Sequence, residues 1–210
     1  MCEKCLLCKR KFERNADDTA GADLQSVPQH RKNKNMSTKY KFRNPQGLYF
    51  ATLTVRHWID IFTRREYNDI IVESLDFCSK NKGLEIFAWV IMTNHLHLIV
   101  RAKEGFLLQN ILRDFKKHTA KTILNAIYEN PQESRKEWLL RGFKTNEGNM
   151  FWQDGNHPIE LQTNEVTIEK LNYIHRNPVK AGFVSREQDF LYSSAADYAG
   201  EKGILKIEFI

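Results

Sequence analysis

The sequence predicts an α+β fold of the ferredoxin-like type: an antiparallel βαββαβ sheet with helices on one face, followed by a C-terminal helix. Three observations lead to this prediction. Segments rich in β-branched and aromatic residues alternate with segments of helical periodicity in the order strand, helix, strand, strand, helix, strand. The 210 residues, of which 41% are hydrophobic, suffice for one core with extensions. Two histidines, His95 and His97, stand in the third strand, which this topology places at the centre of the sheet.

The charge of the chain favours an anionic partner. Its 32 Lys and Arg outnumber its 26 Asp and Glu, and nucleic acid is the commonest partner of proteins with such a net charge, here +6. No run approaches the ~18 apolar residues that cross a bilayer. We therefore expect no membrane partner and a cytoplasmic location.

The first part of the chain is expected to be a leader, because it is polar and shows neither helical nor strand periodicity. Cys2, Cys5 and Cys8 form a C-x-x-C-x-x-C run that offers three thiolates to zinc, with His30 as the available but poorly spaced fourth ligand. We favour instead a disordered leader, or a chain whose translation starts at Met36. The expected organisation is a leader at 1–39, a domain at 40–200 with an insertion at 130–149, and a tail at 201–210.

The first half of the predicted sheet follows directly. Aromatic and β-branched residues are dense between Gly47 and Arg56, which predicts the first strand. Thr63 and Glu66 have the spacing of a capping box and predict a helix from there to about residue 80. The run 84–91 predicts the second strand.

The third strand presents two imidazoles on one face. Successive side chains on a strand point to opposite faces, so His95 and His97 share a face. The opposite face is apolar, with Leu96, Leu98 and Val100. Two neutral imidazoles at this spacing suit one divalent metal, with a third ligand from elsewhere in the chain. The alternative is a pair of strand histidines with ordinary hydrogen bonds.

Residues 106–129 predict a long amphipathic helix. Its apolar face consists of Leu107, Ile111, Leu112, Phe115, Ile123, Leu124 and Ile127. Its other face is cationic, with Arg113, Lys116, Lys117, His118 and Lys121. Such a row is either simply solvated or a surface for a phosphate backbone, and the sequence does not decide between the two.

The last strand and helix are expected after the insertion. The aromatic segment 151–161 predicts a strand broken at Asp154-Gly155, and the final helix should begin after Thr163-Asn164-Glu165. A proline disfavours helical geometry in the residue before it. Because of Pro178, we expect this helix to end at Asn177.

The final helix brings two chemically useful side chains onto one face. Tyr173 and Asn177 are four residues apart, so they lie one above the other. A tyrosine can act as a nucleophile, and an amide oxygen can bind a hard divalent ion. His175 points away and is expected to be a surface or packing residue.

Taken together, these residues resemble the single-tyrosine HUH transposases, specifically the REP-associated tyrosine transposases. The resemblance rests on His95-Leu96-His97 after a strand, on Tyr173-Ile174-His175-Arg176-Asn177-Pro178-Val179-Lys180-Ala181-Gly182, and on the later Tyr192-Ser193-Ser194. It runs from about Tyr40 to the C-terminus.

This resemblance implies a metal-dependent single-stranded DNA endonuclease that binds hairpin DNA, forms a 5′-phosphotyrosine intermediate and rejoins strands. His95, His97 and Asn177 would be the ligands of Mg²⁺ or Mn²⁺, and Tyr173 the nucleophile of a C-terminal catalytic helix. The candidates for DNA backbone contacts are Arg113, Lys116, Lys117, Lys121, Arg176 and Lys180. The protein would act at the nucleoid, as a monomer or as a homodimer.

Two other classes compete with this interpretation. A ferredoxin-like sheet also occurs in RNA-recognition modules, but there exposed aromatic residues occupy the place that His95 and His97 take here. A domesticated relative would keep hairpin binding without transposition, and intact active-site residues do not distinguish it from a mobile one.

Overall fold

The structure is a computed structural model, and it describes residues 42–210. The predictions for residues 1–39, including the cysteine run at Cys2, Cys5 and Cys8, lie outside the described residues. The assignment of 1–39 as a leader therefore stays a prediction.

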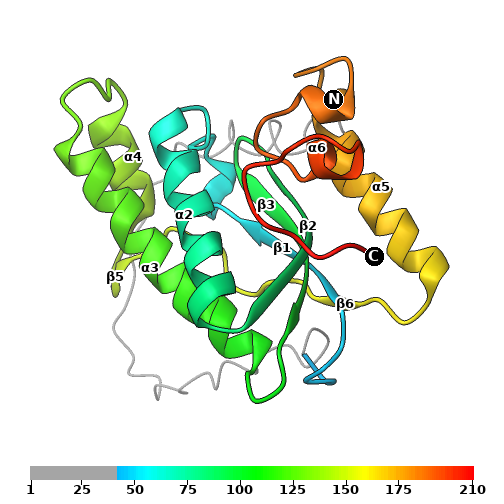
Figure 1. Ribbon diagram of the computed structural model, residues 1–210. Helices are drawn as coiled ribbons and strands as arrows, with labels where there is room; N and C mark the ends of the chain where they lie inside the picture. Colours follow the sequence, from blue (N-terminus) through cyan, green and yellow to red (C-terminus); the bar gives the residue numbers. More distant parts are fainter. Residues whose placement is uncertain (1–41) are drawn as a thin grey trace, which may run out of the picture. The chain divides into compact units, whose positions relative to one another are not determined.

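A four-stranded antiparallel sheet forms the centre of the described part (Figure 1). Its order is β2 (Leu84–Ile91), β3 (His95–Ala102), β1 (Tyr49–Thr54) and β6 (Ile159–Glu160). This is the strand order of a ferredoxin-like sheet, and the histidine strand β3 is central, as predicted. β3 is therefore hydrogen-bonded on both sides, which makes it a rigid platform.

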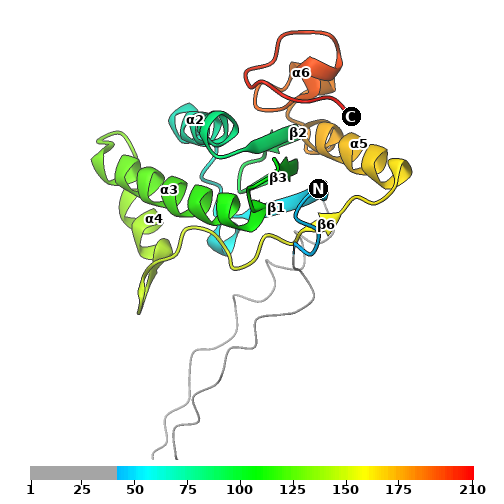
Figure 2. The ribbon, with the colours of Figure 1, turned by 60° about the horizontal axis from the view of Figure 1, so that its bottom comes forward.

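Two helices cover one face of the sheet (Figures 1 and 2). They are α2 (Arg65–Asn81) and α3 (Leu108–Glu129), and their apolar sides bury the larger of two hydrophobic clusters, which we call the main core. The three apolar residues of the histidine strand, Leu96, Leu98 and Val100, are fully buried there, as predicted.

The starts of these two helices differ from the prediction. α2 has Arg64 at its N-cap, without a side-chain cap, and Glu66 accepts a hydrogen bond from Asn130 Nδ2 at 2.6 Å instead of closing a capping box. α3 buries Leu108, whereas the predicted Leu107 is exposed. In both helices tertiary contacts override the local pattern.

The insertion at 130–149 folds into a short helix, α4 (Lys136–Phe143), and a hairpin of β4 (Lys144–Thr145) and β5 (Gly148–Asn149). The buried Glu133 connects this insertion to the rest of the domain. This carboxylate accepts hydrogen bonds from the backbone N–H of Arg135 at 3.2 Å, from Arg135 Nε at 3.3 Å and from Arg64 Nε at 2.8 Å. Burial raises the pKa of Glu133, but these hydrogen bonds, first those from Arg135, hold it below the ordinary value.

The segment 151–161 follows β1 but is not the broken strand that the sequence predicted. Only Ile159–Glu160 is regular strand, although Gln153 and Asn156 still exchange backbone hydrogen bonds with β1. Gly155 and His157 have positive φ, and these two left-handed residues interrupt the ladder.

The opposite face of the sheet is covered by α5 (Asn164–Lys180). It begins two residues earlier than predicted, with Thr163 as its N-cap and Val166 N donating to the Thr163 hydroxyl. The prediction that it ends at Asn177 is wrong. The helix continues through the buried Pro178 to Lys180, three residues past Asn177, and Ala181 N donates to the Asn177 carbonyl at 2.9 Å. α5 and the sheet enclose a smaller cluster, which we call the second core.

The C-terminal residues complete both layers. After η2 (Glu187–Asp189), the backbone of residues 192–194 pairs with the free edge of β2, through Ile91 N to Tyr192 O and Ser194 N to Trp89 O. Beyond α6 (Ala195–Tyr198), Leu205 and Ile207 are buried in the main core, so the predicted tail at 201–210 packs as part of the domain. Among the described residues no helix is long and apolar enough to cross a membrane.

Candidate active site

The two histidines lie side by side on the face of the sheet that α5 covers. In the register of β3 against β1, His95 is opposite Thr54 and His97 is opposite Thr52. The imidazole centroids are 4.7 Å apart with the rings at 73°. The strand alternation therefore places both rings together, as the sequence predicted.

A neighbouring polar atom fixes the orientation of each imidazole. Asn94 Nδ2 donates to Asp60 Oδ1 at 2.8 Å, which leaves the Asn94 carbonyl oxygen to accept from His95 Nδ1 at 2.8 Å. His97 Nδ1 lies 2.9 Å from the hydroxyl of Thr52. With both Nδ1 atoms protonated, each Nε2 carries a free lone pair, which is how partner groups commonly orient metal-binding histidines.

Burial keeps both imidazoles neutral. It lowers the pKa of His95 to about 4, against the smaller opposing effect of Asp60. The pKa of His97 lies well below its ordinary value because of burial and, secondarily, the neighbouring His95. His97 Nε2 is buried and has no hydrogen-bond partner within residues 42–210. A buried nitrogen without a hydrogen-bond partner lowers the stability of the fold, so its presence indicates a further role.

Tyr173 reaches this pair of rings from α5. Its ring centroid is 5.2 Å from that of His97, at 70°, and 5.9 Å from that of Phe50. The side chain is 40% exposed, so a ligand from solvent can reach its hydroxyl. The fully buried Ile174, next along the helix, anchors α5 in the second core.

Asn177 stands one helical turn after Tyr173. Its side-chain nitrogen is buried and has no hydrogen-bond partner in the described part of the chain. The oxygen and nitrogen of an asparagine side chain exchange places on a half-turn of the amide, so this position suits a ligating oxygen equally.

The donor atoms fit a divalent metal. Two neutral imidazole nitrogens and an amide oxygen are ligands that Mn²⁺ or Mg²⁺ accepts. Among residues 42–210 no group of three His, Cys, Asp or Glu gathers at one place. Asn177 stays the predicted third ligand.

Two lysines flank the tyrosine. Lys170 Nζ lies 6.0 Å and Lys180 Nζ 5.9 Å from the Tyr173 ring centroid. Lys180 was among the predicted cations, and it lies in the part of α5 that continues beyond Asn177. The sequence reasoning missed Lys170, although its spacing of three from Tyr173 on a helix was the available signal. Arg176 points away toward Glu187, with 3.7 Å between the charged groups.

The helix α3, which carries the other predicted cations, packs on the opposite face of the sheet from α5 (Figure 2). Lys116 is not free, since its ammonium donates to the carbonyls of Gln153 and Gly155 at 2.8 and 3.1 Å, and burial lowers its pKa to about 8. Lys117 and Lys121 are exposed, and Arg113 pairs with its neighbour Asp114.

His175 is a buried packing residue and not a surface one. Its Nε2 lies 2.9 Å from the Ser194 hydroxyl, and Ser194 Oγ also accepts from the backbone N–H of Trp89 on β2 at 3.0 Å. Burial lowers the pKa of His175 to about 4. The segment 192–194 thus ties α5 to the edge of the sheet, a connection that the sequence did not predict.

The sequence also gave no sign of the loop beside His95. η1 (Arg56–Trp58) contains two successive non-glycine residues with positive φ, His57 and Trp58, both at 56°. Such residues cost about 1–3 kcal/mol each and are concentrated at functional sites. The Trp58 carbonyl accepts from Asn94 Nδ2 at 3.3 Å, and its ring centroid is 6.0 Å from that of His95.

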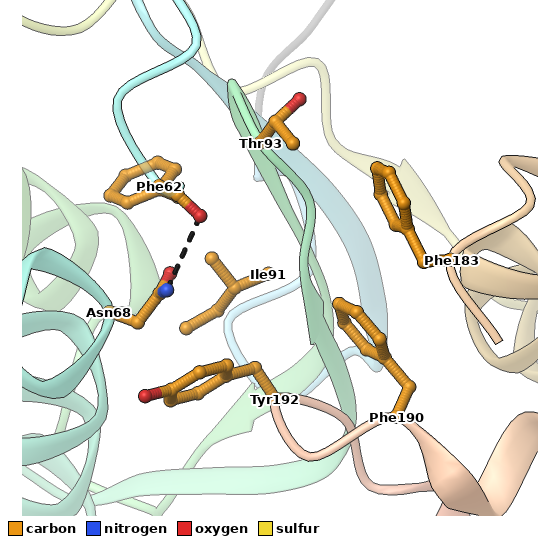
Figure 3. A pocket seen from close by; sticks show the side chains of 7 residues that line it. All are labelled: Phe62, Asn68, Ile91, Thr93, Phe183, Phe190 and Tyr192. Carbon is orange, nitrogen blue, oxygen red and sulfur yellow. Dashed lines mark hydrogen bonds between the residues drawn. The ribbon is translucent and has the colours of Figure 1, made fainter. Parts of the chain in front are cut away.

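A small aromatic hollow opens at the end of β2 (Figure 3). It measures about 200 Å³, and the rings of Phe62, Phe183, Phe190 and Tyr192 line it. Asn68 stands in its wall and donates to the Phe62 carbonyl at 3.3 Å. Thr93 connects the hollow to the turn before His95.

Comparisons with known proteins find similarity to transposases. The family model for IS200-like transposases matches residues 53–177, a range that includes His95, His97, Tyr173 and Asn177. Among solved structures, a REP-associated tyrosine transposase bound to a REP hairpin is similar with a TM-score of 0.59 and 21% identity, over 82% of this chain and 92% of that one. A candidate transposase from Deinococcus radiodurans R1 is similar with a TM-score of 0.42 and 16% identity, over 65% of this chain and 94% of that one. No curated protein matches the chain.

Proposed function

Because the chain belongs to the IS200-like transposases, we propose that it cleaves and rejoins single-stranded DNA next to a hairpin, with Tyr173 as the nucleophile. One observation carries this proposal most directly: the unpaired Nε2 of the buried His97 lies in a ring that contacts the exposed Tyr173. A nucleophile beside an oriented, unprotonated metal-binding group is the arrangement that phosphoryl transfer needs. The fold of the REP-associated tyrosine transposase supports placing the chain in that branch.

His95, His97 and Asn177 would hold Mg²⁺ or Mn²⁺. Their donor atoms are oriented by Asn94 and Thr52 or lack a protein partner. When bound, the metal supplies Lewis-acid polarisation of the scissile phosphate. The protein's part is to keep both imidazoles neutral and fixed in direction before the DNA arrives.

In the cleavage step the hydroxyl oxygen of Tyr173 attacks phosphorus, and the bond from phosphorus to the 3′ oxygen breaks. The tyrosine proton goes to solvent, and the leaving 3′ oxygen takes up a proton to become a hydroxyl. The product is a 5′-phosphotyrosine ester, which conserves one phosphodiester bond. Attack by another 3′-hydroxyl on this ester releases Tyr173 and rejoins the strands, so no ATP is needed.

Two ammonium groups beside the ring suit the charge of this reaction. Lys170 and Lys180 lie about equally far from Tyr173, and a phosphate there would be neutralised from both sides. We therefore assign DNA backbone contacts first to Lys180 and Lys170. Arg113, Lys117, Lys121 and Arg176 stay predicted contacts for DNA beyond the site, whereas Lys116 would first have to leave its carbonyl ligands.

The partner of this site would be hairpin DNA, which the similar transposase of known structure binds. We propose action at the nucleoid in the cytoplasm, with a homodimer as the alternative to a monomer.

The test is a cleavage reaction on a denaturing gel. End-labelled single-stranded hairpin DNA from the flank of the gene is incubated with the protein in Mn²⁺ or in EDTA. We expect metal-dependent cleavage and a protein-linked product, lost by at least about a thousandfold in Tyr173→Phe and in His95→Ala/His97→Ala. Tyr192→Phe is the matched control and should cleave normally. Binding without cleavage under all conditions would contradict the proposal and leave a non-catalytic, domesticated hairpin-binding protein.

A further inference from the structure

We propose that the indole of Trp58 is a stacking platform for an unpaired nucleobase of the DNA strand, close to the scissile phosphate. This inference rests on the proposed function, since it concerns the strand that Tyr173 would cleave. Nothing in the sequence pattern or in the family match assigns a role to this residue.

Trp58 is held in solvent by an unfavourable backbone. Its side chain is 51% exposed, whereas Trp89 and Trp152 are buried. Both Trp58 and the preceding His57 have φ at 56°, a conformation that bulky residues rarely adopt. The backbone strain that exposes this large aromatic face does not improve packing. Strain of this kind is expected where a residue is held in place for binding.

The position of the ring points to the reacting strand. Ring contacts run from Trp58 to His95 at 6.0 Å, from His95 to His97 at 4.7 Å and from His97 to Tyr173 at 5.2 Å. Trp58 is thus at the opposite end of this row from Tyr173. A strand whose phosphate lies at Tyr173 and the histidines reaches the indole within about one further nucleotide.

The loop is also immobilised from behind. The Trp58 carbonyl is bound by Asn94, the residue that orients His95, and the Asp60 carbonyl accepts from Arg135 of the insertion at 3.0 Å. α4 packs directly under η1, since a Cβ on Gly142 would come within 2.9 Å of Ile59 Cδ1. The insertion therefore has a role: it holds the platform in a fixed position relative to the histidines.

The surroundings select nucleic acid as the occupant. A hollow of about 420 Å³ adjoins the loop, and its charged lining residues are the cations Arg56 and Lys144 and the single carboxylate Glu147. An exposed aromatic face next to basic side chains is the usual combination for single-stranded nucleic acid, because every base has a face to stack and every linkage a phosphate to neutralise.

A double-mutant cycle between protein and DNA tests the proposal. The probe is the fluorescein-labelled hairpin strand, and a series of variants replaces one flanking nucleotide at a time by an abasic site. Affinity is measured by anisotropy in the Tyr173→Phe background, so that cleavage does not interfere. Trp58→Ala should weaken binding about tenfold. Trp138→Ala is the matched control, since Trp138 is 53% exposed on α4, and it should bind unchanged.

The decisive result is coupling at one position. At one position, an abasic site should lower the DNA affinity of the protein that has Trp58 about tenfold and leave the affinity of Trp58→Ala unchanged. Trp58→Phe keeps an aromatic face and should show intermediate coupling. Equal losses in both proteins at every abasic position would overturn the platform, even if the cleavage gel succeeds. Coupling without cleavage would overturn the catalytic proposal alone, and failure to bind any strand would overturn both. Thermal unfolding confirms that each variant is folded.

Discussion

The two faces of the sheet are built on different principles. The face toward α2 and α3 is the main core, in which every residue of the histidine strand that points inward is apolar and fully buried. On the face toward α5, which has a smaller core, the same strand carries His97, whose buried Nε2 has no partner among the described residues. One strand therefore contributes to both faces: its even-numbered residues fill the main core, while its two histidines form the candidate metal site. Neighbouring residues should therefore respond to substitution in different ways.

The largest effect on stability is expected in the main core, on the face of the sheet toward α2 and α3. Leu98→Ala removes a fully buried side chain and should lower the free energy of unfolding by about 2–5 kcal/mol, measured by urea denaturation. His97→Ala, one residue away, should cost less, because it also removes an unpaired buried nitrogen. In addition, Mn²⁺ should raise the Tm of the wild type and of Leu98→Ala but not that of His97→Ala. Equal losses, or the same response to Mn²⁺ in both variants, would show that the faces do not divide these roles.

Acid should destabilise the α5 face first. Burial lowers the pKa values of His95 and His175 to about 4 and that of His97 in the same direction, whereas an unfolded histidine titrates near 6.5. The unfolded state therefore binds more protons between pH 6.5 and 4, so stability is full above pH 6.5 and falls as the pH drops toward 4. For His95 and His175 this amounts to about 1 kcal/mol each over the first unit. Urea titrations from pH 7.5 to 5 measure it.

A control separates histidine titration from general acid effects. His175→Gln should flatten this dependence by about one third, because two buried histidines remain. An unchanged slope would mean that His175 is not buried as described.

Removing the hydroxyl of Ser194, which links α5 to β2, should lower the free energy of unfolding more than removing a serine hydroxyl on the other face. Ser194→Ala leaves Trp89 N–H and His175 without their partner and should cost about 1–3 kcal/mol of unfolding free energy, with a fall in cleavage because α5 loses its attachment. Ser74→Ala in α2 is the control. Its hydroxyl only back-bonds to the Ile70 carbonyl within its own helix, so its loss should cost less than about 1 kcal/mol. A larger effect at Ser74 would remove the special role of the link.

The smallest effects are expected at the cations. Lys170→Gln and Lys180→Gln should each weaken DNA binding severalfold and reduce the slope of log Kd against log salt by about 1. Lys117→Gln and Lys121→Gln on α3 test the predicted contacts beyond the site, and unchanged values of both quantities would confine the DNA to the α5 face. A loss at the α3 lysines would extend the DNA path around the domain and support the predicted row of phosphate contacts there.

The sequence predicted what depends on local pattern. The bounds of β2 were predicted correctly because a run rich in apolar and aromatic residues ends at a turn, and the central place of β3 followed from the order of elements. Prediction failed where distant contacts decide. The last residues of α5 are helical despite Pro178, because burial of this proline offsets the hydrogen bond that its missing N–H cannot make. At α2, Glu66 binds Asn130 of the insertion instead of closing the predicted capping box.

The same division holds for the site. His95, His97, Tyr173 and Asn177 were named from spacing and resemblance, and their roles stay a proposal. The groups that orient them were not foreseen. Thr52 depends on the register between strands, and Asn94 on a hydrogen bond to a loop more than thirty residues earlier. No periodicity in one segment reports on such contacts.

The pairing of residues 192–194 with β2 also has a consequence for synthesis on the ribosome. α5 is translated before the segment that attaches it, at about 5–20 residues per second, so the helix emerges while its anchor is still unmade. During that interval the outer edge of β2 is an open strand, which is prone to pair with other chains. Arrival of Ser194 closes this edge and fixes Tyr173 in one event. A nascent chain therefore gains protection from aggregation and a complete candidate site at the same moment.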